Sequence, residues 1–190
     1  SVWAENPFTR ERECLLAEGG NLVHTPTLTI THAQVMSEAE RLTQMLAVRD
    51  GQLTIEFVTP LRLIEDGKLA QAPAFDVLFA RLLGRLDDLA EHFSGSERRG
   101  IEAAQSLQRL AERVRLVESQ TRWVEVWSGS NRRGTASPLS GLVGRATYVA
   151  SDEVWSPLAP WLLWGQLAQV GKSAVKGNGV IQVRIMKDEG

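Results

Sequence analysis

A glycine-rich segment with two lysines contains the residue types best suited to hold a ligand. It reads Gly171-Lys172-Ser173-Ala174-Val175-Lys176-Gly177-Asn178-Gly179. Because glycine has no Cβ, such a segment can turn tightly and bring its amides close to a bound group. Exposed N–H groups beside lysine charges suit phosphate, either of a nucleotide or of a nucleic-acid backbone. The alternative is a turn that only joins a helix to a strand.

The nucleotide interpretation can be tested against the spacing of a P-loop. That motif has four residues between its glycines, and Gly165 lies one residue too far from Gly171. A P-loop also follows a strand and precedes a helix, whereas here an apolar helical pattern precedes the segment and a strand pattern follows it. ATP or GTP binding through a P-loop is therefore disfavoured.

Arginines outside this segment are further candidates for contact with a polyanion. Arg132 and Arg133 lie in a polar stretch between two expected strands, Arg62 follows the first strand pattern, and Arg145 belongs to the third. The alternative for each is ordinary solvated surface charge. Trp123 and Trp127 alternate with other residues on one expected strand, where they can stack on bases or fill the core.

Histidine and cysteine give no catalytic or metal assignment. His24, His32 and His92 fit surface or capping positions, and their spacing to cysteine or carboxylates does not match a metal site. Cys14 is the single cysteine and has no histidine partner that the sequence places beside it. The catalytic residue is left unassigned, and neither a metal nor a cofactor is expected.

The composition is that of an ordinary globular protein. The 190 residues are 43% hydrophobic and carry a net charge of −2, so binding to a polyanion requires a local basic surface. No apolar run reaches the roughly 18 residues of a membrane helix. A single cysteine allows no internal disulfide and is typical of a reducing compartment. We expect a cytoplasmic protein without a membrane partner.

The hydrophobic periodicity predicts an N-terminal extension followed by one α+β domain. Residues 1–31 lack regular structure apart from a short strand at 28–30, and Thr31 caps a helix at about 32–47. Residues 1–52 then form an extension or the tail of a further domain. From residue 53 to 190 the order is strand, helix in two pieces, strand, strand, helix and strand. The expected strands are 53–57, 114–127, 142–149 and 180–186, separated by helices that begin at 75, 101 and 155 and by a polar loop at 128–138.

This order predicts the split βαβ or ferredoxin-like fold, as in RNA-recognition modules. Four antiparallel strands would carry helices on one face and leave the other face free. Many metabolic and regulatory domains share the fold, so the fold alone does not give the function. In the second helix, Pro160 has to lie in the first turn, where proline is tolerated.

Several segments, in order along residues 53–186, resemble CRISPR-associated repeat-processing endoribonucleases of the RAMP superfamily. The matching segments are Leu53-Thr54-Ile55-Glu56-Phe57-Val58-Thr59-Pro60-Leu61-Arg62-Leu63, Pro73-Ala74-Phe75, Arg122-Trp123-Val124-Glu125, Leu139-Ser140-Gly141-Leu142-Val143-Gly144, and the end from Gly165-Gln166-Leu167 through Val170-Gly171-Lys172 to Gly177-Asn178-Gly179. The last of these is similar to the signature glycine-rich loop of that superfamily. The chain departs from the family pattern at Gln169, where histidine is frequent, and at Lys176, where an aromatic residue is frequent.

The resemblance implies a protein of two ferredoxin-like domains that binds CRISPR repeat RNA and cuts it once. It implies attack by the 2′-hydroxyl on the adjacent phosphate without a metal, which leaves a 2′,3′-cyclic phosphate and a 5′-hydroxyl. The family's catalytic histidine usually belongs to the N-terminal domain, so this chain would be mainly the RNA-binding C-terminal part. The implied RNA contacts are Gly171, Lys172, Ser173, Lys176, Gly177, Gly179, Arg62, Arg132, Arg133 and Arg145.

Two other functions stay open on the sequence alone. One is a non-catalytic RNA-binding subunit that assembles with other proteins of a CRISPR effector complex. The other is a ferredoxin-like regulatory domain that does not bind RNA, and the slightly negative net charge suits this second reading.

Overall fold

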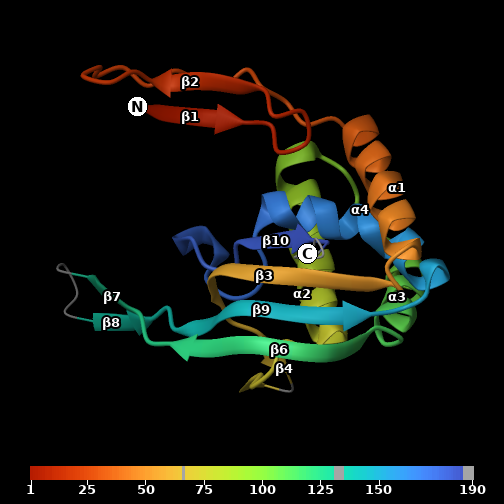
Figure 1. The fold of residues 1–190 in the computed structure, drawn as a ribbon. Helices are drawn as coiled ribbons and strands as arrows, with labels where there is room; N and C mark the ends of the chain where they lie inside the picture. Colours follow the sequence, from red (N-terminus) through yellow and green to blue (C-terminus); the bar gives the residue numbers. More distant parts are fainter. Residues whose placement is uncertain (66, 131–134, 186–190) are drawn as a thin grey trace, which may run out of the picture.

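A four-stranded antiparallel sheet forms the centre of the chain in the computed structural model, which describes residues 1–65, 67–130 and 135–185 (Figure 1). Its strands are β3 (Gln52–Leu61), β6 (Arg115–Val124), β9 (Gly141–Val149) and β10 (Ile181–Arg184). They lie in the order β10-β3-β9-β6, and each neighbouring pair is antiparallel. This is the strand order of the split βαβ arrangement, so the predicted ferredoxin-like α+β fold is confirmed.

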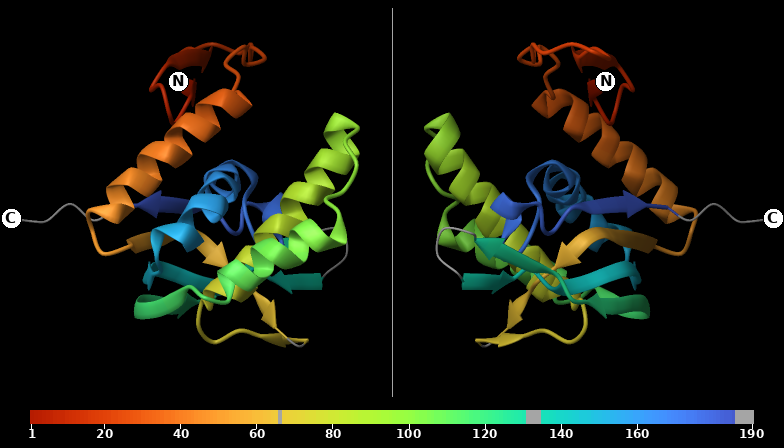
Figure 2. Two further views of the ribbon diagram at one scale, coloured as in Figure 1. Left: turned by 90° about the vertical axis from the view of Figure 1, so that its right-hand side faces the viewer. Right: turned by 90° about the vertical axis from the view of Figure 1, so that its left-hand side faces the viewer.

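Helices cover one side of this sheet, as the two views of Figure 2 show. They are α1 (His32–Ala47), α2 (Phe75–Leu89), α3 (Ile101–Ala111) and α4 (Asp152–Ala168). A π-helical turn (Ala90–Ser94) extends α2. The core lies between helices and sheet because alternate residues of β3, among them Leu53, Ile55 and Phe57, are buried.

An aromatic cluster fixes the helices to the sheet. Phe75 at the start of α2 makes edge contacts with Tyr148 of β9 and with Trp155 of α4. Both polar ends of that cluster are paired: the Tyr148 hydroxyl donates to the Pro73 carbonyl at 2.6 Å, and the Trp155 indole N–H donates to the Gly51 carbonyl at 2.7 Å. Burial raises the pKa of Tyr148 well above its usual value.

The helix predicted at 32–47 is confirmed and joins the core. The Thr31 hydroxyl accepts from the Gln34 amide, and the Gln34 side-chain oxygen accepts from the Thr31 amide, which completes a capping box. Val35, Leu42 and Leu46 are buried in the same cluster as the sheet residues.

The N-terminal 31 residues contain more regular structure than the sequence indicated. Strands β1 (Val2–Glu5) and β2 (Arg12–Leu16) form a hairpin. The strand expected at 28–30 is absent from this described segment. The amides of Thr27 and Leu28 donate to the Glu13 carboxylate at 2.7 and 3.1 Å, so they serve a side chain and not a strand ladder.

The strand expected at 114–127 is divided in two. β6 ends at Val124, because the Val126 amide donates to the Ser140 hydroxyl at 3.1 Å instead of continuing the ladder. The predicted polar loop at 128–138 was wrong in part, since β7 (Trp127–Ser130) pairs with β8 (Thr135–Pro138). A further short pair, β4 (Ile64–Glu65) and β5 (Lys68–Leu69), follows β3.

The position predicted for Pro160 was also wrong. Because α4 begins at Asp152, three residues earlier than expected, both Pro157 and Pro160 lie inside the helix and not in its first turn. None of the helices in the described ranges combines the length and apolar character that a membrane span requires.

Candidate nucleic-acid interface

The glycine-rich segment forms a closed loop between α4 and β10. Its two ends meet where the Val170 amide donates to the Gly179 carbonyl at 2.9 Å. The end of β3 and the residue after it also bind the loop. The Gly179 amide donates to the Pro60 carbonyl at 3.1 Å, and the Lys172 amide donates to the Arg62 carbonyl at 3.0 Å. The order helix, loop, strand confirms the argument against a P-loop.

The backbone of this loop explains its glycines. Gly171 and Gly179 have φ of +86° and +77°, in the left-handed region that disfavours other residues. A Cβ at Gly171 would lie 2.7 Å from the Arg62 carbonyl oxygen, and one at Gly179 would lie 1.7 Å from the Val170 carbonyl oxygen. Gly177 and Ser173 also have positive φ.

The loop has an anchored base and an exposed tip. Lys172, Lys176 and Gly177 are exposed, whereas Asn178 and Gly179 are buried. A short 3₁₀ turn (Ala174–Lys176) forms the tip. Among the described residues, no hydrogen bond engages the amides of 173–175, which lie between the two lysines in the sequence and line the depression described below.

Two residues that sequence reasoning missed hold the loop in place. The side-chain amide of the buried Asn178 donates to the Leu139 carbonyl at 2.8 Å. The Thr59 hydroxyl donates to the Gly177 carbonyl at 2.8 Å and accepts from the Val180 amide at 2.9 Å. Both residues stand in segments that resemble the family, but nothing in the sequence indicated the partner of either side chain.

A depression of about 360 Å³ lies between the loop and α2. Arg81, Gly84, Arg85 and Asp88 line it from α2, and residues 171 and 173–175 line it from the loop. Arg81 donates to the Ile64 carbonyl and Arg85 to the Ala168 carbonyl, which positions both guanidinium groups. The four-residue spacing of Arg81 and Arg85 places both on one face of α2 and could be seen in the sequence. That the glycine-rich loop lies opposite this face could not.

Arg62 connects the loop with the base of the β7–β8 hairpin. Its carbonyl accepts from Lys172, while its guanidinium Nη1 donates to the Pro138 carbonyl at 3.0 Å. The structure therefore brings Arg62 together with the glycine-rich loop. Arg132 and Arg133 lie outside the described residues.

Arg145 is placed apart from this group. It lies on β9, on the sheet face without helices, and its guanidinium is 3.6 Å from the Glu56 carboxylate. Arg184 pairs with the same carboxylate at 2.6 Å.

The histidines do not form a recognisable catalytic group. His32 is the first residue of α1, and His24 precedes that helix. His92 lies in the π-helical turn after α2, where its Nδ1 is 2.7 Å from the Asp88 carbonyl oxygen. In the described ranges, no group of three or more histidine, cysteine or carboxylate residues could hold a metal ion.

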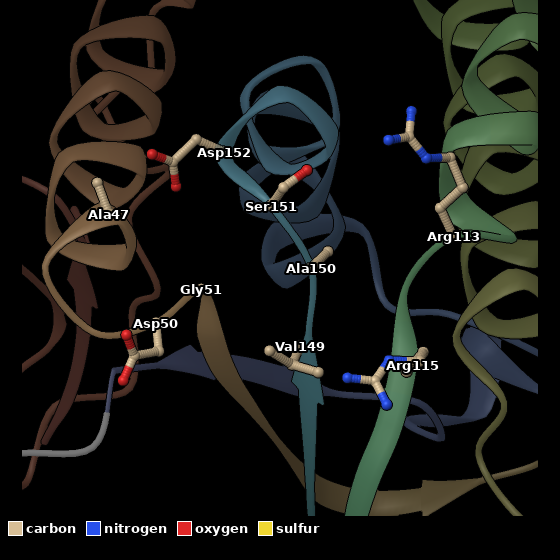
Figure 3. Close-up of a pocket in the computed structure, with 9 residues that line it drawn as sticks. All are labelled: Ala47, Asp50, Gly51, Arg113, Arg115, Val149, Ala150, Ser151 and Asp152. Carbon is tan, nitrogen blue, oxygen red and sulfur yellow. The ribbon is translucent and has the colours of Figure 1, made fainter.

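A second depression of about 510 Å³ lies at the opposite end of α4, shown in Figure 3. The side chains of Arg113 and Arg115 stand on one side of it, and those of Asp50 and Asp152 stand on the other (Figure 3). Two cations facing two carboxylates give no net attraction for a polyanion. The depression beside the glycine-rich loop is thus the better candidate for RNA.

Comparison with known families supports the resemblance seen in the sequence. The model of the family described as CRISPR-associated endoribonuclease Cas6 matches residues 55–181, a range that includes the whole glycine-rich loop. No curated protein matches the chain significantly.

Solved structures share the fold at low sequence identity. A Cas6 product complex has a TM-score of 0.57 at 16% identity, and the match covers 82% of this chain and 56% of that chain. Thermus thermophilus Cas6 has a TM-score of 0.54 at 18% identity, with 77% and 57% covered. A partial Cas6-RT-Cas1–Cas2 complex has a TM-score of 0.62 at 13% identity, with 90% and 30% covered.

The chain spans little more than half the length of the first two of these structures. The family match, in contrast, extends over well more than half of this chain and includes strands, helices and loop in one continuous range. The chain belongs to the CRISPR-associated endoribonuclease Cas6 family.

Proposed function

We propose that this chain is the RNA-binding part of an endoribonuclease that processes precursor CRISPR RNA by cutting its repeats. The observation that carries the proposal is the family match over residues 55–181 together with an anchored glycine-rich loop whose basic tip is exposed. The product complex among the structural neighbours supports the same substrate class. We further propose that the protein is cytoplasmic and that RNA binding resides in residues 53–190, with residues 1–52 as an extension.

The phosphate backbone of the repeat lies along the tip of the loop and the depression beside α2. The three amides of 173–175 bind one phosphate group, Lys172 and Lys176 each neutralise a neighbouring phosphate, and Arg81 and Arg85 bind further phosphates from α2. The main chain of the loop takes the conformation that presents these groups through the positive φ of Gly171, Ser173, Gly177 and Gly179. Arg132, Arg133 and Arg145 stay predicted contacts.

In the proposed reaction the RNA supplies its own nucleophile. The 2′-oxygen forms a bond to the adjacent phosphorus while the bond to the 5′-oxygen breaks, which yields a 2′,3′-cyclic phosphate and a 5′-hydroxyl. A general base removes the proton of the 2′-hydroxyl and a general acid protonates the leaving oxygen. Cations of the interface stabilise the charge that develops on the phosphate. The base and acid are unassigned.

The double variant Lys172→Ala/Lys176→Ala tests the interface. We expect weaker binding of a labelled repeat RNA and a slope of log affinity against log salt that is shallower by roughly 1.5, because two phosphate contacts are lost. The matched control Arg109→Ala/Arg113→Ala removes the same charge from exposed positions on and just after α3 and should leave the slope unchanged. Equal slopes for both double variants would contradict the proposed interface.

A cleavage assay with chelator present tests the reaction. A single cut with a cyclic phosphate end supports the endoribonuclease. Binding without any cut, when the full-length protein is assayed, would identify a non-catalytic RNA-binding subunit, and the Cas6-RT-Cas1–Cas2 complex among the structural neighbours is the observation that favours this second function. Absence of RNA affinity would leave a regulatory domain.

A further inference from the structure

Two large aromatic side chains are exposed at the base of the β7–β8 hairpin. Trp127, the first residue of β7, is 62% exposed, and Trp123 near the end of β6 is 38% exposed. Leaving an indole ring in water forgoes a large hydrophobic gain, so exposed tryptophan often marks a binding surface. We define these two residues as the tryptophan pair.

Backbone and side-chain contacts tie the tryptophan pair to the glycine-rich loop. Trp127 lies opposite Pro138 in the β7–β8 ladder, and the Pro138 carbonyl accepts from Arg62. The backbone carbonyl of Arg62 in turn accepts from the Lys172 amide. A second link runs from the Asn178 amide to the carbonyl of Leu139, whose own amide donates to Val126. The strand ends that carry the tryptophan pair are therefore tied to the base of the glycine-rich loop through Arg62, Pro138 and Leu139.

One ring of the pair is oriented by hydrogen bonds. The Trp123 indole N–H donates to one Glu125 carboxylate oxygen at 2.6 Å, and the buried Ser140 hydroxyl donates to the other at 2.8 Å. This arrangement fixes the indole edge of Trp123, and an oriented ring loses little conformational freedom on binding.

We propose that the tryptophan pair, Trp127 above all, stacks on an unpaired nucleobase that flanks the RNA segment held by the glycine-rich loop. The proposal rests on the proposed function and deepens it, because it names single-stranded RNA beside the segment bound by the loop as the ligand of this surface. A base has two free faces only where it is unpaired, and aromatic stacking accepts any base. The Arg62 guanidinium binds the carbonyl of Pro138, which lies opposite Trp127 in the ladder, so a cation near Trp127 favours a nucleic acid over an apolar protein segment. Trp123 lies instead against the Glu125 carboxylate, which makes Trp127 the main contact.

The test compares two RNAs and four variants of the full chain. One RNA is a repeat hairpin with single-stranded flanks, and the other is the same hairpin with blunt ends. The variants are Trp127→Ala, Trp127→Phe, Trp123→Ala and the control Trp3→Ala. Trp3 is 56% exposed on β1, outside the candidate interface, and so matches Trp127 in type and exposure.

We expect Trp127→Ala to bind the flanked RNA about tenfold more weakly and the blunt RNA unchanged, since one base stack is lost. Trp127→Phe keeps most of the affinity, Trp123→Ala shows a smaller loss than Trp127→Ala, and Trp3→Ala shows none. The salt slope stays constant because the stack carries no charge. Far-UV circular dichroism and thermal melting check that each variant is folded.

Equal losses on both RNAs, or no loss on the flanked RNA, would overturn the stacking proposal while RNA binding itself stands. Wild-type protein that binds neither RNA would instead remove the proposed function, and the two failures are thus separable. If Trp127→Ala changes the oligomeric state in size-exclusion chromatography and not the RNA affinity, the rings serve a protein contact and the proposal is wrong.

Discussion

Gly179 occupies a position in which a side chain has no room. Its φ is +77°, and a Cβ would lie 1.7 Å from the Val170 carbonyl oxygen, which accepts no such approach from carbon. Backbone strain and the overlap act together, so we expect Gly179→Ala to lower the free energy of unfolding by roughly 3 kcal/mol. Chemical denaturation measures this change, and RNA affinity of the folded fraction should fall as the loop shifts.

Gly84 is the matched control for that substitution. It lies in the middle of α2, where a Cβ would meet nothing within 4 Å. Gly84→Ala should raise stability by up to about 1 kcal/mol, because alanine is the better helix former. If both variants lose the same stability, the tight packing of Gly179 against Val170 is not what matters at that position.

The backbone conformation of the loop glycines could be predicted from the sequence, but the hydrogen-bond partners of the loop could not. The glycines at 171 and 179 indicated a backbone with positive φ, since only glycine adopts that conformation without strain. Asn178 reads as a surface turn residue, yet it is buried because Leu139, far away in the chain, offers a carbonyl. Such pairing is decided by the assembled fold and leaves no local pattern.

At the scale of elements, one arginine joins α2, α4 and the connection before α3. The Arg99 guanidinium lies 4.0 Å from the centre of the Trp161 ring in α4 and 3.3 Å from the Asp87 carboxylate at the end of α2. Its side chain is largely buried, and this burial lowers the pKa of Arg99 although the group stays charged. A planar cation suits both contacts.

We expect Arg99→Lys to lower the free energy of unfolding by roughly 1–2 kcal/mol, because lysine keeps the charge and loses the planar stack. Thermal and chemical unfolding measure the loss. The neighbouring Arg98 is the control: it pairs with Asp88 and Glu91 on the surface, and Arg98→Lys should cause no measurable change. Similar effects of the two substitutions would contradict a specific role of the stack.

Amphipathic elements were the part of the fold that the sequence determined best. The three- and four-residue spacing of leucines predicted α2 from Phe75, and the structure starts that helix at the same residue. The β1–β2 hairpin was missed because its register depends on side chains such as Asn6, which is buried and accepts from the Phe8 and Thr9 amides. Short hairpins without an alternating apolar face give no periodic signal.

At the scale of the whole molecule, the N-terminal segment and the central domain are held by different forces. α1 contributes apolar residues to the common core, whereas the segment before it adds Phe8 and Ile30 to the edge of that core and is tied together by two carboxylates. Glu13 binds the Thr27 and Leu28 amides, and Glu5 pairs with Arg10 and Arg12. In the folded chain a hydrogen bond from the Thr27 amide lowers the pKa of Glu13, and hydrogen bonds from Arg10 and Arg12 lower the pKa of Glu5.

The sign of the pH effect follows from these lowered pKa values. A carboxyl group whose pKa is lower in the folded state than in the unfolded state stabilises the fold at neutral pH, and this contribution is lost as the pH falls through the folded value. The buried apolar core between sheet and helices does not titrate in that range. Acid should therefore loosen residues 1–31 before it unfolds the central sheet.

Hydrogen exchange read out at each amide separates the two parts. Between neutral pH and about pH 3.5, after correction for the intrinsic exchange rate, we expect protection to fall in β1, β2 and the Thr27 and Leu28 amides while β3 and β9 stay protected. Glu13→Gln should cause the same local loss at neutral pH, because a neutral amide is a weaker acceptor than a carboxylate. The control Glu11→Gln changes an exposed neighbour and should leave Thr27 and Leu28 protected. Loss of protection in the sheet at the same pH as in the hairpin would show that the two parts unfold together, against the separation inferred from their contacts.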